Sequence, residues 1–168
     1  IAAQAYATLE PVAANIARVV LFGPAHRVPL EGMAVPDADA FATPLGMVPL
    51  DRDVMQAACA FPGVCISNEA HRLEHSLEVQ LPFLQTVLDR FTLVPVVVGH
   101  CDARTVAVVM DALWGGPETL LVVSTDLSHF HSYEEARSHD NRTCSRLMNK
   151  DSSLTGRDAC GAYALNGL

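Results

Sequence analysis

The chain has 168 residues, of which 50% are hydrophobic and 18% are charged, and its formal net charge is −8. This composition is typical of a folded domain with a buried core and excludes a disordered chain. The eleven basic residues are scattered, which argues against a nucleic-acid partner because phosphate binding needs a clustered basic face. No apolar stretch approaches the roughly 20 residues of a membrane span, so we expect no membrane partner.

Cysteine usage and the chain ends bear on compartment and domain organisation. The five cysteines are odd in number and form no C-x-x-C pair, which is typical of thiols in a reducing cytoplasm. The sequence starts at Ile1 in a predicted helix and ends within another helical run. We therefore expect residues 1–168 to form a single α/β domain that is truncated at both ends.

The first half of the chain is predicted to hold one buried strand between two helices. Residues 18–22 follow a short helix and are apolar on both faces, as in a buried parallel strand. Residues 23–49 are rich in proline and are predicted to be a long loop. A helix is predicted over 52–60, with Asp51 as its N-cap.

The second half continues the alternation. A helix is predicted over 74–90, because leucines recur there at spacings of four, three and four residues, and Pro82 predicts a kink or a late start. The remaining predicted elements are strands over 92–98 and 119–124, a helix over 103–114 and a helix from Ser132 to about Asn149. The pattern predicts an α/β fold whose sheet is mainly parallel or mixed, with helices on both faces.

Two predicted strands lead directly into polar segments. One leads into a Gly-Pro-Ala-His segment that ends at His26, and the other leads into a run that contains Asp126 and His129. Ligands of open α/β sheets bind beyond the carboxyl ends of the strands, and imidazole is the commonest metal ligand. Either histidine alone is as well explained by a loop residue that caps backbone groups. Together they favour a shared, metal-centred polar site.

Two further features carry potential chemistry. His71, Glu74 and His75 form an H-x-x-E-H pattern, in which two histidines bind zinc and the glutamate acts as a base in zinc peptidases. The alternative is a helix start with Glu74 in its favourable first turn. Cys160 precedes the last helical run and is either a metal ligand or a small core residue.

Five segments, in chain order, resemble the Memo family, including its bacterial and archaeal members. They are Leu-Phe-Gly-Pro-Ala-His at 21–26, Phe-Ala-Thr-Pro-Leu-Gly at 41–46, Glu-His-Ser-Leu-Glu at 74–78, Ser-Thr-Asp-Leu-Ser-His at 124–129 and Ala-Cys-Gly at 159–161. Each segment alone is weak evidence for the family, but five such segments in the same order, over nearly the whole chain, are specific to it. The resemblance implies an α/β fold similar to that of class III extradiol dioxygenases, the non-haem iron enzymes that open catechol rings.

The same resemblance implies roles for individual residues. It makes His26 a metal ligand and makes Cys160 the ligand that replaces the glutamate of the dioxygenases. It also makes His129 an acid/base histidine and His75 a substrate-side histidine, with Asp126 lining the same pocket. The implied cofactor is an iron or copper ion, which we expect to be held weakly here. The reason is that the family's first metal histidine, in a P-H-A-G-Y segment, is not part of this sequence.

The resulting prediction is a Memo-family protein with a non-haem metal site for redox or dioxygenase-like chemistry. One alternative is a non-catalytic protein that binds a peptide or another partner in the same pocket. The other is a zinc hydrolase that uses the segment 71–75. The expected partner is an unidentified small molecule or peptide, and the family resemblance adds a radical-SAM protein as a possible partner.

Overall fold

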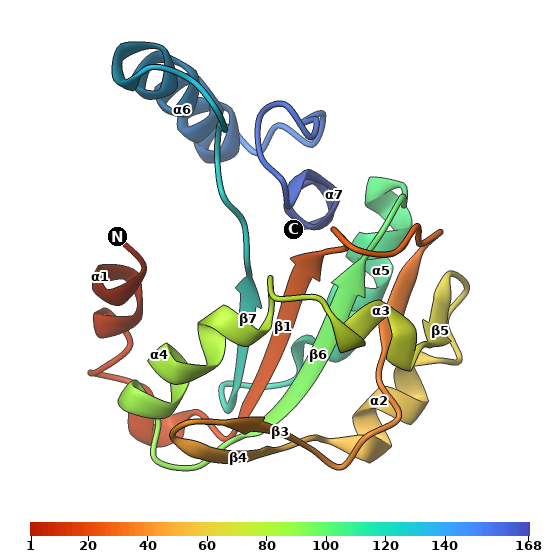
Figure 1. Cartoon of the computed structure of the whole chain (residues 1–168). Helices are drawn as coiled ribbons and strands as arrows, with labels where there is room; N and C mark the ends of the chain where they lie inside the picture. Colours follow the sequence, from red (N-terminus) through yellow and green to blue (C-terminus); the bar gives the residue numbers. More distant parts are fainter.

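Two long apolar segments form the middle of the sheet in this computed structural model, which describes residues 1–168. They are flanked by shorter strands in the order β5-β2-β6-β1-β7 (Figure 1). The strands are β1 (Arg18–Pro24), β2 (Met33–Val35), β5 (Val64–Ile66), β6 (Thr92–Val98) and β7 (Thr119–Val123). β1 pairs in parallel with β6 and β7, and β2 pairs in parallel with β5 but antiparallel with β6. The predicted mixed, mostly parallel sheet is thereby confirmed.

The helices cover both faces of this sheet. They are α1 (Ala2–Ala7), α2 (Arg52–Ala58), α3 (Asn68–Arg72), α4 (Leu81–Val87), α5 (Ala103–Trp114), α6 (Tyr133–Met148) and α7 (Ala162–Gly167), with 3-10 turns at Ala13–Asn15 and Glu78–Gln80. α1 packs against α4, and α5 packs against both α2 and α7. Successive side chains of β1, Val19 to Phe22, point to opposite faces and are all fully buried, so neither face of the central strand is open.

Several helix boundaries follow from local capping chemistry, as the sequence predicts. The Asp51 carboxylate accepts the N–H of Val54 at the start of α2. Ser132 and Glu135 form a capping box at the start of α6, in which each side chain accepts a backbone N–H of the other residue. No helix has the length and apolar character needed to cross a membrane.

The prediction of a loop over 23–49 is wrong in part. β1 continues to Pro24, β2 joins the main sheet, and β3 (Ala40–Thr43) pairs with β4 (Gly46–Pro49) in a hairpin. The three residues of β2 are at most 1% exposed, because they lie between β5 and β6. Such a short strand is stabilised by its neighbours in the sheet rather than by its own pattern.

The prediction of one helix over 74–90 is also wrong in its extent. α4 begins only at Leu81, after the 3-10 turn at Glu78–Gln80, so the late start is confirmed. Pro82 fits the first turn of a helix, where a missing N–H costs nothing. Upstream, Glu74 and Ser76 use their side chains for long-range hydrogen bonds. The spaced leucines are nevertheless buried, as their periodicity predicts.

α6 projects away from the sheet, together with the segment 149–161 that follows it (Figure 1). Thr143 is the one buried residue of this helix. The Arg146 guanidinium binds the carboxylates of Asp151 and Asp158, at 2.7 and 3.0 Å, and thereby ties α6 to that segment. Polar contacts therefore tie α6 to the segment 149–161, in which Leu154 and Ala159 are the buried apolar residues.

Candidate metal centre

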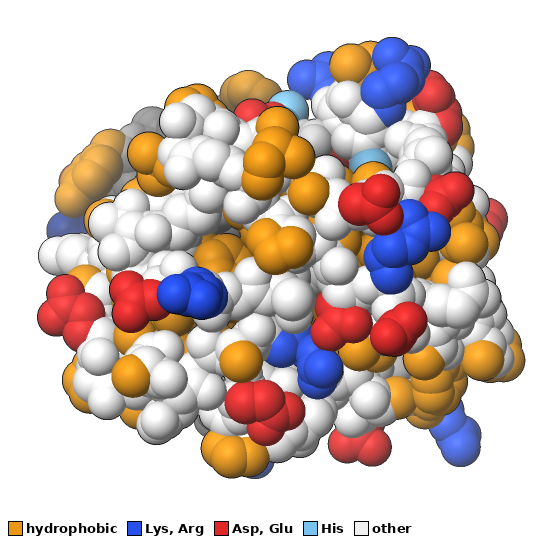
Figure 2. Space-filling model, turned by 90° about the horizontal axis from the view of Figure 1, so that it is seen from below, with side chains coloured by type: hydrophobic (Ala, Val, Ile, Leu, Met, Phe, Trp, Pro, Cys, Tyr) orange, Lys and Arg blue, Asp and Glu red, His pale blue; other side chains and the backbone are white.

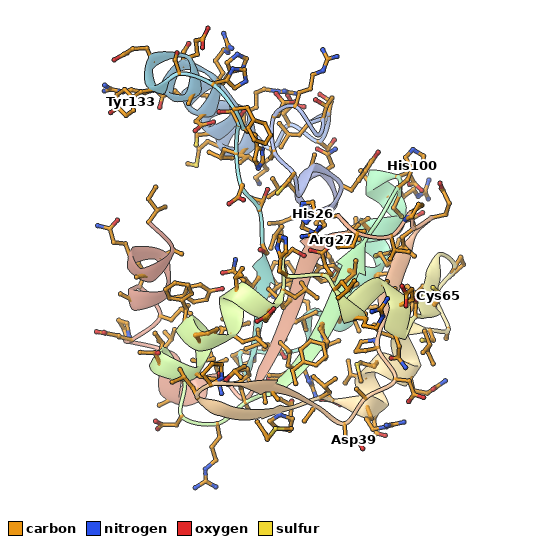
Figure 3. The ribbon with its side chains drawn as sticks, viewed as in Figure 1. His26, Arg27, Asp39, Cys65, His100 and Tyr133 are labelled. Atoms are coloured by element: carbon orange, nitrogen blue, oxygen red, sulfur yellow. The ribbon has the colours of Figure 1, made fainter.

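The carboxyl end of β1 places His26 at the upper edge of the sheet (Figure 3). The strand reaches this point through Gly23, where a Cβ atom would lie 2.7 Å from Leu77 Cδ2 and 3.0 Å from Ser76 Oγ. The absence of a side chain at Gly23 therefore allows the segment around Ser76 to approach β1. Ser76 Oγ donates a hydrogen bond of 2.9 Å to the carbonyl oxygen of Pro24 and holds the two segments together.

Glu74 is the buried partner of His26. Its side chain is 1% exposed, and one carboxylate oxygen accepts the backbone N–H of His26 at 2.5 Å. The other oxygen lies 3.0 Å from His26 Nδ1 and accepts the N–H of Ser76 at 2.9 Å. Burial raises the pKa of Glu74, but the hydrogen bonds from His26 and Ser76 outweigh it and lower the pKa to about 2.

The ionised Glu74 decides how the His26 ring is used. A carboxylate only accepts hydrogen bonds, so His26 Nδ1 must carry a proton and donate it to Glu74. A neutral His26 then has its lone pair on Nε2, which is the atom available to a ligand. Carboxylates that orient a ligating histidine in this way are common around metal ions. His75 adds a second imidazole, whose ring centroid lies 5.7 Å from that of His26.

Three further candidate ligands lie beyond the end of β7. These are Asp126, His129 and Cys160. Each offers one potential ligand atom, and the three atoms lie within 4.8 Å of one another. The backbone N–H of Asp126 donates to Cys160 Sγ at 3.1 Å, and the N–H of Cys160 donates to the Asp126 carbonyl oxygen at 3.1 Å. His129 Nε2 lies 3.8 Å from the Asp126 carboxylate. Gly161 allows the chain after Cys160 to approach the end of β7, since a Cβ there would lie 2.8 Å from both Ser124 O and Thr125 Cβ.

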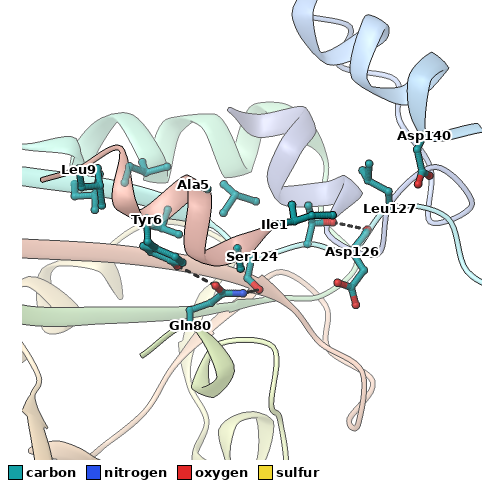
Figure 4. Close-up of a pocket in the computed structure, with 15 residues that line it drawn as sticks. Ile1, Ala5, Tyr6, Leu9, Gln80, Ser124, Asp126, Leu127 and Asp140 are labelled. Atoms are coloured by element: carbon teal, nitrogen blue, oxygen red, sulfur yellow. Dashed lines mark hydrogen bonds between the residues drawn. The ribbon is translucent and has the colours of Figure 1, made fainter. Parts of the chain in front are cut away.

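A chain of hydrogen bonds joins the ends of β1 and β7. Ser124 Oγ donates to the carbonyl oxygen of Ser76 at 2.6 Å and accepts from Gln80 Nε2 at 2.9 Å. Gln80 Oε1 in turn accepts the Tyr6 hydroxyl at 2.9 Å (Figure 4). Ser76 also binds the carbonyl oxygen of Pro24. These bonds together fix the positions of α1, the segment 74–80 and the ends of β1 and β7 relative to one another.

One cavity of about 860 Å³ brings the two groups of residues together. His26, His129 and Cys160 all line it, although they come from segments far apart in the sequence. The candidate ligand atoms nevertheless fall into two clusters. His26 groups with Glu74 and His75, whereas Cys160 groups with Asp126 and His129. The structure thus places three of the five sequence-predicted site residues in the cavity lining, with His75 beside His26 and Asp126 beside Cys160, but does not gather the five into one ligand set.

His71, the remaining histidine of the H-x-x-E-H pattern, belongs to neither cluster. It lies on α3, and its Nε2 is 3.0 Å from the carbonyl oxygen of Ala34. Burial lowers the pKa of His71, so the ring is neutral and donates this bond. The Glu74 carboxylate is turned toward His26 instead. The spacing of a zinc peptidase is therefore present without the corresponding arrangement of side chains.

Sequence reasoning missed the hydrogen bonds between Glu74 and His26, which are 48 positions apart. The available signal was the position of Glu74 immediately before His75 in a polar segment. It also missed Arg142 and Arg157, which line the cavity from α6 and from the segment that follows. The spacing of these two arginines in the sequence does not indicate that they line a common cavity.

The fold and the site define an α/β protein with a polar cavity, rich in histidine, at the carboxyl ends of parallel strands. The family model described as Memo-like protein matches residues 1–157 of the chain. The chain belongs to the Memo family.

Relatives from bacteria, archaea and animals agree with this assignment. A MEMO1 family protein of Aquifex aeolicus is 36% identical over 127 residues, which cover 73% of this chain and 48% of the relative. One from Methanosarcina barkeri is 34% identical over 157 residues, covering 90% and 57%. The memo-1 homolog of Caenorhabditis elegans is 32% identical over 132 residues, covering 75% and 38%. The chain spans about half the length of the prokaryotic relatives it matches.

A solved structure supports the fold independently. The crystal structure of the uncharacterized protein JW3007 from Escherichia coli matches with a TM-score of 0.60 and 15% identity. The match covers 98% of this chain and 81% of the other. At this identity the likeness concerns the fold alone.

Proposed function

We propose that the protein is a metal-dependent redox protein whose iron or copper ion is bound by His26 and Cys160. The observation that carries the proposal is the shared cavity, which His26, His129 and Cys160 line from three separate segments. Cavities with convergent polar groups at the carboxyl ends of parallel strands are the usual place for ligands in this class of fold.

The donor atoms suit such an ion. His26 presents Nε2, because Glu74 engages Nδ1, and Cys160 presents a sulfur that already accepts the N–H of Asp126. Imidazole and thiolate together favour iron, copper or zinc over magnesium or calcium. An iron or copper ion bound there would supply one-electron redox chemistry that no side chain of this cavity offers.

The remaining side chains would bind substrate and move protons. His129 is held 3.8 Å from the Asp126 carboxylate and can accept or donate a proton at the cavity wall. His75 lies beside His26 and can contact a substrate that approaches that ring. Glu74 fixes the orientation of His26 from behind and does not face the cavity.

The test is the metal content of the chain purified without oxygen, measured for the wild type and for His26→Ala, Cys160→Ala and His71→Ala. We expect iron or copper to bind to the wild type and to His71→Ala, and to be lost from the other two variants. His71→Ala is the matched control, because His71 is a partly buried histidine outside both clusters.

Two outcomes would contradict the proposal. Zinc that is lost only from His71→Ala would favour the hydrolase. No metal in any variant, with a peptide or partner bound in the same cavity, would favour a non-catalytic binding protein.

A further inference from the structure

The cavity that holds His26 and Cys160 is also where basic side chains of this acidic chain gather. Three of its eleven basic residues line this one cavity, whereas on the face in Figure 2 basic side chains are spread out and several lie beside acidic ones. The lining consists of His26, His129, Phe130, His131, His139, Arg142, Arg146, Thr155, Gly156, Arg157, Asp158 and Cys160. Three arginines and one aspartate leave two positive charges even when every histidine is neutral.

The surplus charge belongs to Arg142 and Arg157. Arg146 is already engaged, because its guanidinium binds Asp151 and Asp158 and donates to Ser153. Arg142 and Arg157 form no side-chain hydrogen bond and no ion pair with the protein. Their two planar groups of N–H donors therefore remain available to a ligand.

Nearby acidic groups on α6 are engaged elsewhere. The Asp140 carboxylate accepts the N–H of Ser128, and Glu135 accepts the N–H and hydroxyl of Ser132. Asp140 and Glu135 do not line the cavity, and Asp158 is its one acidic lining residue. The cavity thus favours an anion within a molecule whose net charge is negative.

We propose that this cavity binds a small substrate through an oxyanion, either a carboxylate or a phosphate, which Arg142 and Arg157 hold. Guanidinium groups pair with both oxyanions through two parallel hydrogen bonds. His131 and His139, whose stacked rings lie 4.8 Å apart between centroids, add further N–H donors to the same wall. That the bound anion is a substrate rests on the metal site proposed above.

The position of the arginines orients such a substrate. Arg142 comes from α6 and Arg157 from the segment after it, the lobe that projects beyond the sheet (Figure 1). His26 and Cys160 lie at the sheet end of the same cavity. An anion held by the arginines therefore directs the rest of the molecule toward the candidate metal ligands. The volume of about 860 Å³ suits a small molecule and not a polymer.

The test is a titration of the metal-free chain with inorganic phosphate and, separately, with benzoate, followed by backbone amide NMR. We expect saturable shifts at Gly156 and at His131 and His139 with at least one of the two probes. The double variant Arg142→Gln with Arg157→Gln should bind that probe at least tenfold more weakly. Arg137→Gln is the matched control, since it removes the same charge from α6 at a residue that does not line the cavity.

The outcomes separate this inference from the metal site. Saturation by phosphate alone or by benzoate alone supports the inference and identifies the oxyanion. Equal affinity in the wild type and the double variant overturns it, and so does an equal loss in Arg137→Gln. A double variant with well-dispersed amide signals that binds metal but no probe supports the arginine site. A wild type that binds the probe but no metal counts against the metal site and supports the arginine site.

Discussion

The two walls of the cavity are built in different ways. The inner wall is His26 at the end of β1, with His75 beside it and Glu74, whose side chain is 1% exposed, behind it. The outer wall includes His129 and Cys160, with Asp126 beside them. The Asp126 side chain is 84% exposed and the His129 side chain is 42% exposed. Packing and buried hydrogen bonds fix the inner wall, whereas backbone contacts to sulfur and ion pairs of the α6 lobe hold the outer wall.

Because of this difference, we expect substitutions in the two walls to affect different properties, namely the free energy of unfolding and ligand binding. Glu74, which supports the inner wall, is buried, so its substitution should first reduce the free energy of unfolding. Groups of the outer wall contact few core residues, so substitutions there should change ligand binding while the fold persists.

Glu74→Gln should lower the free energy of unfolding by about 3 kcal/mol. The amide cannot accept from His26 Nδ1 and from both backbone N–H groups as a carboxylate does, and buried charged acceptors are costly to replace. Urea unfolding measures the loss. Glu78→Gln, at an exposed position four residues away, should change stability by less than about 0.5 kcal/mol. Equal losses of stability in both variants would show that the Glu74 carboxylate does not stabilise the inner wall.

The same carboxylate should give the wild type an acid-sensitive stability. The pKa of Glu74 is about 2 in the folded chain and 4.5 for an ordinary glutamate, so the unfolded state takes up a proton first as pH falls. The stability from Glu74 is fully present above pH 4.5 and is lost between pH 4.5 and about 2. Unfolding measured across this range should be steeper with pH in the wild type than in Glu74→Gln. Parallel curves would contradict the assignment.

Gly23→Ala should destabilise the chain by about 2 kcal/mol. The added methyl group would lie 2.7 Å from Leu77 Cδ2, within a packed core that has little room to yield. Thermal unfolding measures the change. Gly156→Ala, in the outer lobe, meets no atom within 4 Å and should leave the melting temperature nearly unchanged. A tolerated Gly23→Ala would show that the segment near Ser76 is not pressed against β1.

Arg146→Gln should lower global stability less than Glu74→Gln or Gly23→Ala does. Its ion pairs with Asp151 and Asp158 are partly exposed, and such pairs are weak and screened by salt. The change should appear instead as faster amide hydrogen exchange in residues 149–161, with exchange in β1 unaffected. A loss of stability as large as that of Glu74→Gln would abolish the distinction between the two walls.

The strongest local signals predicted most of the sheet and several helices. The apolar runs of β1, β6 and β7 and the caps at Asp51 and Ser132 act within a few residues, so the sequence alone reveals them. β2 and β5 are three residues each and depend on partners far along the chain. The leucine spacing near α4 predicted burial correctly but not the helix start, because Glu74 and Ser76 bind the end of β1.

For the site, the position of polar residues after strands predicted where His26 and Asp126 would lie. The contact between Glu74 and His26 could not be predicted, since it depends on how an irregular segment folds across β1. The arginines of the outer lobe were hidden for a similar reason. Their place in the cavity depends on the orientation of α6 and not on any spacing in the sequence.

The claim that His26 and Cys160 share one metal ion is tested most directly by the absorption spectrum of the chain loaded with Co²⁺ without oxygen. If the two residues share the ion, the wild type should show a thiolate-to-cobalt charge-transfer band that is lost in Cys160→Ser and weakened or lost in His26→Ala. The other four cysteines serve as internal controls, because none lies in either ligand cluster. Cobalt that binds with the same charge-transfer band in Cys160→Ser, or with no such band in the wild type, would contradict the account.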